Sequence, residues 1–282
     1  MKTKKEVVYC KMCTTSNQRP NTSIEFKNSI STKKNFINFS EDSICDACRY
    51  SIIKETQIDW SEREKELLDL LERFRKDDGS YDCIVPGSGG KDSVYTAYLL
   101  KFKYKMNPLL VTWPPILPTE EGLKNFHSWL DLGFSNYRHY PNQKVNKILT
   151  KLAFENLFHP FQPFTIGQKN LAPKVAMSLG VKLIFYGEHE AERGSDISTT
   201  KSSKRDINSF SSDINDIDEI FLAGIKVKEL RKKYKLSKND FFEYKPSKID
   251  DIIKNDLEFH YLGYFVKCIL WRFISFSIKF WV

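Results

Sequence analysis

Residues 88–93 combine the chemical groups that a phosphate-binding loop needs. They follow an apolar run at 81–85, typical of a buried strand, and they open a helical pattern at 93–102. Glycines allow backbone N–H groups to approach an oxyanion closely, and a helix N-terminus adds positive potential. Hydroxyl groups donate hydrogen bonds, a lysine supplies a cation, and an aspartate can hold Mg²⁺. The stretch therefore predicts a nucleotide-phosphate site made of Ser88, Gly89, Gly90, Lys91, Asp92 and Ser93.

Two commoner glycine-rich motifs do not fit this loop. A Walker A motif needs Gly where Val85 stands and Ser or Thr where Asp92 stands, and a dinucleotide fingerprint starting at Gly87 needs Gly at the same aspartate. The loop instead resembles the Ser-Gly-Gly-x-Asp-Ser loop of the PP-loop ATP pyrophosphatases. That resemblance implies binding of the β,γ-pyrophosphate of ATP and adenylation of a substrate. The alternative is a tight glycine-rich turn without a ligand.

Two Cys-x-x-Cys pairs lie near the start of the chain. Each pair can present two thiolates to one tetrahedral ion, and four thiolates complete a structural Zn²⁺ site. An iron–sulfur cluster uses the same ligands and is the alternative, whereas a redox dithiol needs only one pair. The stretch between the pairs is longer than in common zinc fingers, but it is polar and could loop out. The predicted zinc ligands are Cys10, Cys13, Cys45 and Cys48.

The overall composition sets only broad limits. With 282 residues and 41% hydrophobic residues, the chain can bury a sizeable core and hold one large and one small domain. Its net charge of +8 suits anionic ligands, but lysine is spread along the chain, so charge alone selects no partner. The charged start, 1–5, is not followed by an apolar segment, so a cytoplasmic protein is expected. Charges interrupt the apolar stretch at 265–282, so no membrane span is expected.

Strand and helix patterns alternate after residue 79 and predict an α/β fold with a doubly wound, mostly parallel sheet. Before them, Ser61 and Glu64 form a capping box that predicts a helix over 61–76 with Ser61 as N-cap. Residues 195–218, rich in Ser, Asp, Lys and Asn, are expected to form a surface insertion. Strands are expected at 81–86, 108–113, 136–140 and 182–186, and helices at 92–104, 119–132, 143–157 and 168–179. The expected divisions are a zinc-ribbon-like module at 1–58, a linker helix at 59–78, a PP-loop domain at 79–265 and an apolar tail at 266–282.

Ligands of doubly wound sheets bind beyond the carboxyl ends of the strands, where three further stretches are expected. Thr112 and Trp113 end one strand, and the indole forms either a wall beside adenine or part of the core. Gln168 and Lys169 begin a helix, where a cation is unfavourable; Lys169 therefore indicates an anionic ligand, unless it is a solvated charge. Glu188 follows a late strand and either holds Mg²⁺ or a polar substrate, or belongs to an ordinary acidic loop.

Taken together, these motifs resemble the N-acetyl sugar amidotransferases of bacterial surface-polysaccharide (lipopolysaccharide O-antigen) and flagellin-glycan pathways. The resemblance covers the cysteine pairs and the phosphate loop and continues to about residue 265. It is most specific over 144–169, where Lys-Leu-Ala-Phe-Glu-Asn-Leu precedes Pro-Phe-Gln-Pro-Phe and Gly-Gln-Lys. The chain departs from the family at Asn146, usually His, and at Phe158 and His159, usually Gly-Asp. Family members continue beyond Tyr264, so a C-terminally truncated copy is expected.

The resemblance implies that a sugar N-acetyl group is converted into an acetamidino group with ATP and ammonia. The amide oxygen would attack the α-phosphorus, giving an O-adenylyl imidate and Mg²⁺-pyrophosphate, and ammonia would then displace AMP. The expected partners are a nucleotide-linked N-acetyl sugar and a separate glutaminase-type ammonia donor, and no nucleic acid is expected. The expected catalytic residues are Lys91, Asp92, Lys169 and Glu188.

Two other functions remain as alternatives. A tRNA-thiolating enzyme also joins cysteine pairs to a PP-loop, but its chemistry needs cysteines near the loop. Between Ser93 and Phe265 the chain has none. The other alternative is an ATP-binding remnant without catalytic activity.

Overall fold

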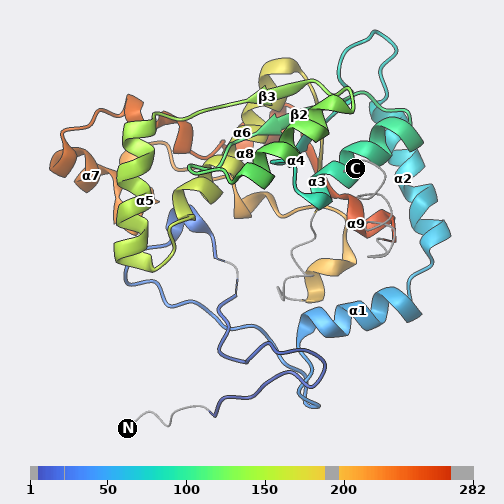
Figure 1. The fold of residues 1–282 in the computed structure, drawn as a ribbon, viewed down its shortest axis with the longest axis horizontal. Coiled ribbons are helices and arrows are strands. Elements are labelled where there is room, and N and C mark those ends of the chain that lie inside the picture. Colours follow the sequence, from blue (N-terminus) through green and yellow to red (C-terminus); the bar gives the residue numbers. More distant parts are fainter. Residues whose placement is uncertain (1–5, 22, 188–196, 268–282) are drawn as a thin grey trace.

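A five-stranded parallel sheet forms the centre of the molecule (Figure 1). Its strands are β1 (Cys83–Pro86), β2 (Pro108–Thr112), β3 (Asn136–Arg138), β4 (Leu183–Tyr186) and β7 (Glu258–Tyr261). The structure, a computed structural model, describes residues 6–21, 23–187 and 197–267. The strand order is β3-β2-β1-β4-β7, and all four neighbouring pairs are parallel. This arrangement confirms the predicted α/β fold with a doubly wound, mostly parallel sheet.

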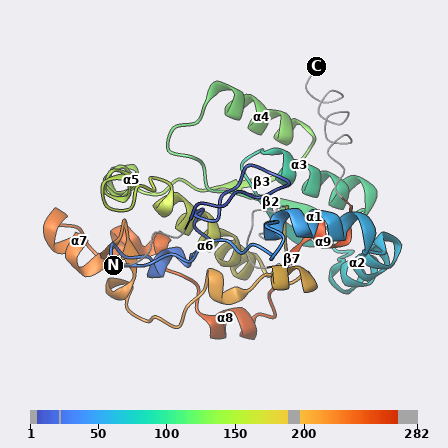
Figure 2. The same ribbon diagram turned by 90° about the horizontal axis from the view of Figure 1, so that it is seen from below.

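Helices cover both faces of the sheet. They are α2 (Trp60–Phe74), α3 (Lys91–Tyr98), α4 (Glu120–Asp131), α5 (Gln143–Leu157), α6 (Gln162–Leu179) and α8 (Ile249–Lys254). Because successive strand residues point to opposite faces, Val85 and Phe185 join an apolar layer with α2, α3 and α4, whereas Ile84 and Ile184 join a second layer with α5 and α6. Figure 2 shows α3 and α4 on one side of the strands and α6 and α8 on the other.

Two helix starts differ from the prediction. Asp59, not Ser61, is the N-cap of α2, because its carboxylate accepts hydrogen bonds from the backbone N–H groups of Ser61 (2.9 Å) and Glu62 (3.2 Å). Helix α6 begins at Gln162 rather than at residue 168, with a proline in its first turn, a position that proline favours. Helix α5 has the predicted bounds.

Neither the burial of the stretch 197–218 nor the strand β7 was predicted from the sequence. The expected surface insertion is wrong for these residues, because Phe210 and Ile217 are buried in the main core. The backbone N–H of Arg205 donates to the carbonyl of Phe259 (2.9 Å), which attaches the stretch to the edge strand β7. Neither the stretch nor β7 has the continuous apolar run that is typical of a buried parallel strand. Contacts with distant parts of the chain therefore decide that the stretch and β7 are buried.

Part of the polar stretch between the cysteine pairs packs against the main core, although most of its described residues are exposed or half-buried (Figure 1). The 3-10 turn η1 (Glu25–Lys27) places Phe26 in the core beside α6. The backbone N–H of Ile30 donates to the carbonyl of Gly224 (3.2 Å).

The other helices and strands of the described residues are α1 (Asp46–Thr56), β5 (Phe221–Leu222), β6 (Ile225–Lys226), α7 (Val227–Tyr234) and α9 (Leu262–Phe265). There are also 3-10 helices at Ile197–Lys201, Ile207–Ser209, Ile217–Glu219 and Asn239–Tyr244 and a π-helical turn at Leu99–Lys103.

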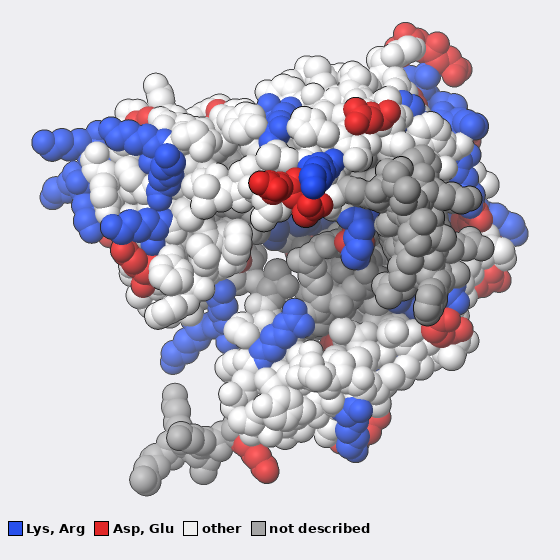
Figure 3. Space-filling model, in the orientation of Figure 1, with Lys and Arg blue, Asp and Glu red and all other residues white. Residues whose placement is uncertain are grey.

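Basic side chains gather at the edge of the molecule where α7 lies (Figure 3). Some of this charge is paired: Arg231 lies 2.6 Å from Asp218, and Lys226 lies 2.6 Å from Glu219. Part of the positive charge at this edge is therefore offset by neighbouring carboxylates. In the part of the chain that the structure describes, no helix has the length and apolar character needed to cross a membrane.

Candidate active site and cysteine cluster

The candidate site lies where β1 and β4 run side by side. From β1 the chain builds the sheet outward through β2 and β3, and then it crosses back to place β4 on the other side of β1. Such a point leaves a crevice beyond the carboxyl ends of the two strands, where doubly wound sheets bind their ligands. The loop 87–90 follows β1, and Gly187 follows β4.

Two glycines allow the loop and its neighbours to approach closely. Gly89 has φ of +87°, and a Cβ atom there would lie 2.8 Å from the Cα of Phe126 in α4. A Cβ atom on Gly187 would lie 2.6 Å from the carbonyl carbon and oxygen of Asp92. Because both neighbours are backbone atoms, a side chain at either position would displace the loop or the start of α3.

The start of α3 is suited to an anion. Gly90 is its N-cap and supplies no side-chain hydrogen bond, so backbone N–H groups of the first turn remain available. The hydroxyl of Ser93 donates to the carbonyl of Gly90 (2.9 Å), and the Nζ of Lys91 lies 2.7 Å from the Oδ1 of Asp92. The loop therefore presents N–H donors, a hydroxyl, a cation and a carboxylate within six residues.

The larger of two cavities beside the loop has a volume of about 490 Å³. One wall is the loop and the start of α3, and the facing wall is the first half of α6. The ends of β4 and β7 and the residues Arg205 and Glu25 complete it. Its lining residues are Glu25, Pro86, Gly87, Ser88, Gly90, Asp92, Ser93, Phe161, Phe164, Thr165, Gln168, Lys169, Tyr186, Gly187, Arg205 and Tyr261.

A smaller cavity of about 240 Å³ lies beyond the end of β2 and shares Ser88 with the larger one. Thr112 lines it and holds the loop, since its hydroxyl donates to the carbonyl of Gly87 (2.8 Å). The hydroxyl also accepts a hydrogen bond from the side chain of Asn136 (2.9 Å). Apart from Arg138 and a few polar groups, its walls are prolines and apolar side chains, among them Pro114, Pro115, Leu117, Pro118, Leu123 and Phe126.

Most residues predicted for the site lie at these two cavities. Gly89 and Lys91 belong to the loop without lining either cavity, and Glu188 lies outside the described residues. Thr112 lines the smaller cavity. Those that line the larger cavity are Ser88, Gly90, Asp92, Ser93, Gln168 and Lys169.

Trp113 is a core residue and lines neither cavity. Its side chain is 2% exposed, and its ring lies 5.6 Å from that of Tyr244 and 5.4 Å from that of His139. A Cβ atom on Gly167 would lie 2.3 Å from the indole, so α6 packs directly onto it. The indole therefore matches the alternative interpretation of this residue, as part of the core.

Arg205 is a cavity residue that the sequence did not indicate. It is 8% exposed, and its guanidinium carbon lies 4.1 Å from the centre of the Tyr186 ring and 5.3 Å from that of Phe210. Stacking on an aromatic face orients a guanidinium and contributes attraction. Because Arg205 lies in a stretch with the composition of a surface loop, no sequence signal separated it from its neighbours.

Glu25 is a second cavity residue that the sequence did not indicate. Burial raises the pKa of its carboxyl, but the hydrogen bond and charge of His159, the charge of Lys34 and the hydrogen bond of Asn28 together lower the pKa below its ordinary value. The Nε2 of His159 lies 3.7 Å from the Oε1 of Glu25. Glu25 therefore adds a buried negative charge to a cavity that also contains Asp92, Lys169 and Arg205.

The four predicted cysteine ligands form one cluster. Their sulfur atoms all lie within 4.8 Å of one another, and those of Cys13 and Cys45 are 3.7 Å apart. Four sulfurs bound to one zinc ion at about 2.3 Å lie about 3.8 Å apart in a tetrahedron. The cluster therefore fits a tetrahedral metal ion, and the four thiols could form a zinc site.

The surroundings of the cluster lower the pKa of Cys10 and Cys13, whereas burial raises the pKa of Cys45 and Cys48. Burial raises the pKa of Cys10, but backbone N–H groups, those of Cys45 (3.3 Å) and Met12 (3.4 Å) among them, more than offset this and lower the pKa to about 6. Burial, and then the neighbouring sulfurs, raise the pKa of Cys48. A divalent cation would remove this conflict, because metal ligation stabilises thiolates.

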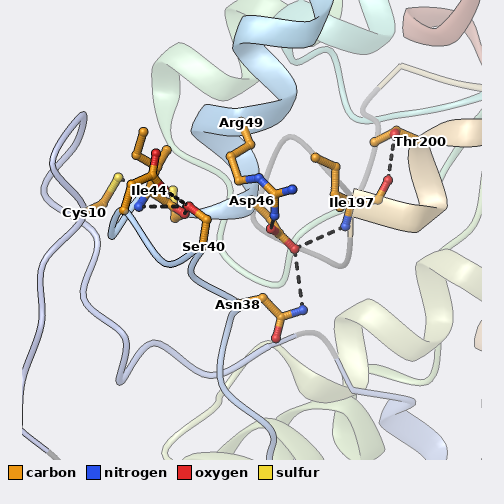
Figure 4. A network of polar contacts seen from close by, with 10 residues as sticks. Cys10, Asn38, Ser40, Ile44, Asp46, Arg49, Ile197 and Thr200 are labelled. Atoms are coloured by element: carbon orange, nitrogen blue, oxygen red, sulfur yellow. Dashed lines mark hydrogen bonds and ion pairs between the residues drawn. The ribbon is translucent and has the colours of Figure 1, made fainter.

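The second cysteine pair is tied to the stretch that follows the β4 loop (Figure 4). Asp46 is buried between the two cysteines of that pair, and its Oδ2 accepts hydrogen bonds from the backbone N–H of Ile197 (3.3 Å) and the side chain of Asn38 (3.5 Å). Its other oxygen pairs with Arg49 (3.0 Å). Asp46, which follows Cys45 in the chain, therefore contacts the stretch that carries Arg205.

Comparison with known proteins gives limited matches. No protein-family model matches the chain. The uncharacterized protein MJ1599 of Methanocaldococcus jannaschii is 36% identical over 95 residues, which are 34% of this chain and 34% of that protein, so the chain spans about a third of the length of this relative. A solved structure, the NAD+ synthetase from Burkholderia pseudomallei, matches with a TM-score of 0.33 and 13% identity, over 84% of this chain and 94% of that one. A likeness at that level carries no argument about function.

Proposed function

We propose that this chain is an ATP-dependent enzyme that activates an amide by adenylation. The observation that carries the proposal is the position of the loop 88–93. It lies at the crevice between β1 and β4, it leads into the uncapped start of α3, and it separates two cavities. Such a helix start is an anion site, and a loop between two cavities suits a reaction between two bound substrates.

We assign the smaller cavity to the nucleobase and the loop to the β,γ-pyrophosphate of ATP. The apolar walls around Pro115 and Phe126 suit a planar ring, whereas the loop offers N–H donors. Asp92 would hold Mg²⁺ through its carboxylate, which lines the larger cavity, and the ion would supply charge neutralisation as pyrophosphate leaves. Lys91 and Lys169 would bind phosphate oxygens, and Gln168 would orient the reacting groups.

We assign the larger cavity to an N-acetylated sugar, carried by a nucleotide, whose acetamido group becomes an acetamidino group. The volume of about 490 Å³ is ample for such a ligand. Phe161 and Phe164 offer apolar ring faces, and Thr165 and Gln168 offer hydrogen-bonding groups for hydroxyls. In this proposal ammonia comes from a separate glutaminase-type partner, and the product enters surface-polysaccharide or flagellin-glycan synthesis in the cytoplasm.

The cysteine cluster is proposed to be a structural zinc site. All four ligand positions are supplied by cysteines, which leaves no open position for a substrate. The expected content is one zinc ion per chain, and an iron–sulfur cluster would instead show visible absorption.

The deciding experiment is exchange of radioactive pyrophosphate into ATP. Exchange that depends on a UDP- or CMP-linked N-acetyl sugar is expected, and a Gly90→Asp variant, which adds a negative charge at the start of α3, is expected to abolish it. Dependence on tRNA would instead support a thiolating enzyme. ATP binding without any exchange would contradict the proposed activity.

A further inference from the structure

The stretch between the two cysteine pairs brings one carboxylate, that of Glu25, into the larger cavity. Phe26, the next residue, is fixed in the main core, and the side chain of Gln162 donates a hydrogen bond to the carbonyl of Glu25 (2.9 Å). The same amide side chain accepts a hydrogen bond from the backbone N–H of Ala223 (2.9 Å). Glu25 is therefore held in place by its backbone, and the residue lines the cavity.

The carboxylate of Glu25 has long contacts for a buried charge. Its side chain is 9% exposed. Its contacts with described residues are the hydroxyl of Ser23 (3.3 Å), the amide of Asn28 (3.4 Å) and the imidazole of His159 (3.7 Å), and the charge of Lys34 also acts on it. Charge-assisted hydrogen bonds to a carboxylate are usually about 2.7–2.9 Å long. Glu25 therefore retains acceptor capacity toward a group that enters the cavity.

The neighbours of Glu25 in the cavity wall define which group this is. Aromatic side chains, those of Phe161, Phe164 and Tyr186, line the same cavity. A carboxylate together with aromatic rings is a favourable surrounding for a small nitrogen cation, because both attract positive charge. The cations Lys169 and Arg205 also line the cavity and suit the anionic substrates, so the wall contains groups for both signs of charge.

We propose that Glu25 binds the nitrogen nucleophile as an ammonium ion and accepts its proton during the transfer step. The proposal rests on the proposed amide adenylation. The ammonium N–H bond breaks, its electron pair stays on nitrogen, and the proton goes to a carboxylate oxygen of Glu25. The nitrogen then forms a bond to the imidate carbon, and the C–O bond to AMP breaks with its electron pair leaving on the phosphate oxygen. One hydrogen moves from the attacking nitrogen to the sugar nitrogen, so the products are an amidinium group, AMP and protonated Glu25.

A Glu25→Gln variant tests this role because it keeps the shape and removes the base. Both pyrophosphate exchange and amidine formation from ammonium chloride are measured, and their ratio is compared with that of the native chain. The ratio is expected to fall about 100-fold at pH 7, the size typical of a lost general base. The remaining amidine formation should rise with pH in parallel with free ammonia, and Glu25→Asp should recover part of the loss.

Glu155→Gln serves as the matched control, because Glu155 is half exposed on α5 and pairs with Lys151 outside the cavity. It is expected to leave both rates unchanged. If Glu25→Gln lowers exchange and amidine formation equally, Glu25 binds the acceptor or supports the fold, and the proposal is wrong. Unfolding curves of the variants separate these two cases.

A second measurement does not depend on the acceptor. Crystals of the native chain and of Glu25→Gln are soaked in rubidium chloride, since rubidium is close to ammonium in size and scatters anomalously. An anomalous peak beside the Glu25 carboxylate, absent from the variant, is expected. Absence of the peak from native crystals, or its persistence in the variant, would refute the cation site. If no N-acetyl sugar supports exchange, the adenylation proposal fails while this measurement still decides the cation site.

Discussion

Phe158 ends α5 in a backbone conformation that costs free energy, and its replacement tests how the α5–α6 turn is held. It has φ of +51°, and its backbone N–H donates to the carbonyl of Phe154 (3.0 Å). Glycine is favoured at this position, and an L-residue with a Cβ atom there costs about 1 kcal/mol relative to glycine.

The magnitude follows from the exposure of the ring. Phe158 is 87% exposed, so about 13% of a side chain of roughly 200 Å² is buried, worth about 0.6 kcal/mol at 25 cal/mol per Å². Phe158→Ala loses this contact and keeps the strain, so the free energy of unfolding should fall by about 0.6 kcal/mol. Phe158→Gly loses the contact and the strain, so it should be about 1 kcal/mol more stable than Phe158→Ala and close to the native chain.

Urea unfolding followed by circular dichroism measures these differences, provided that the slope with denaturant is unchanged. Glu155 offers a control in the same helix at an ordinary helical position, where Gly should be about 1 kcal/mol less stable than Ala, the opposite order. Lys235, exposed at the end of α7 with φ of +53°, should repeat the order seen at Phe158. Equal stability of the Ala and Gly variants at Phe158 would refute the argument from backbone strain.

Three further changes test other parts of the structure. Gly187→Ala should weaken ATP binding at least about tenfold in calorimetry, because its Cβ would lie 2.6 Å from the backbone of Asp92 and must displace the start of α3. Unchanged affinity would contradict the close approach. Cys45→Ser should reduce bound zinc from one ion per chain to well below one, measured by plasma emission spectroscopy, and it should lower the melting temperature. Full zinc content in this variant would show that the cluster is not the ligand set. Burial lowers the pKa of Lys174 to about 8. Between pH 8 and about 10.5 the unfolded chain therefore binds more protons at this lysine than the folded chain does, and the free energy of unfolding should rise with pH by at most about 1.4 kcal/mol per pH unit. A Lys174→Met variant should lack this rise in urea unfolding, and an identical pH profile would exclude the effect.

The local parts of the fold and site could be predicted from the sequence. The strand, glycine loop and helix around 81–102 are continuous in the chain, so their composition alone indicates a phosphate site. The two cysteine pairs likewise show their chemistry by spacing, and the structure brings all four sulfurs together. Helix α5 was predicted with its bounds, and its apolar residues recur at helical spacing.

Other parts of the site were decided only by the tertiary structure. Glu25 and Arg205 come from stretches with polar, loop-like composition, and their positions at the cavity depend on burial of Phe26 and on pairing of the second stretch with β7. Trp113 was placed in the core by α6, whose Gly167 leaves room for the indole. Composition and periodicity report which groups a local segment contains and which of its faces is apolar. They do not report which distant segment covers that face, because that is fixed by packing between residues far apart in the chain.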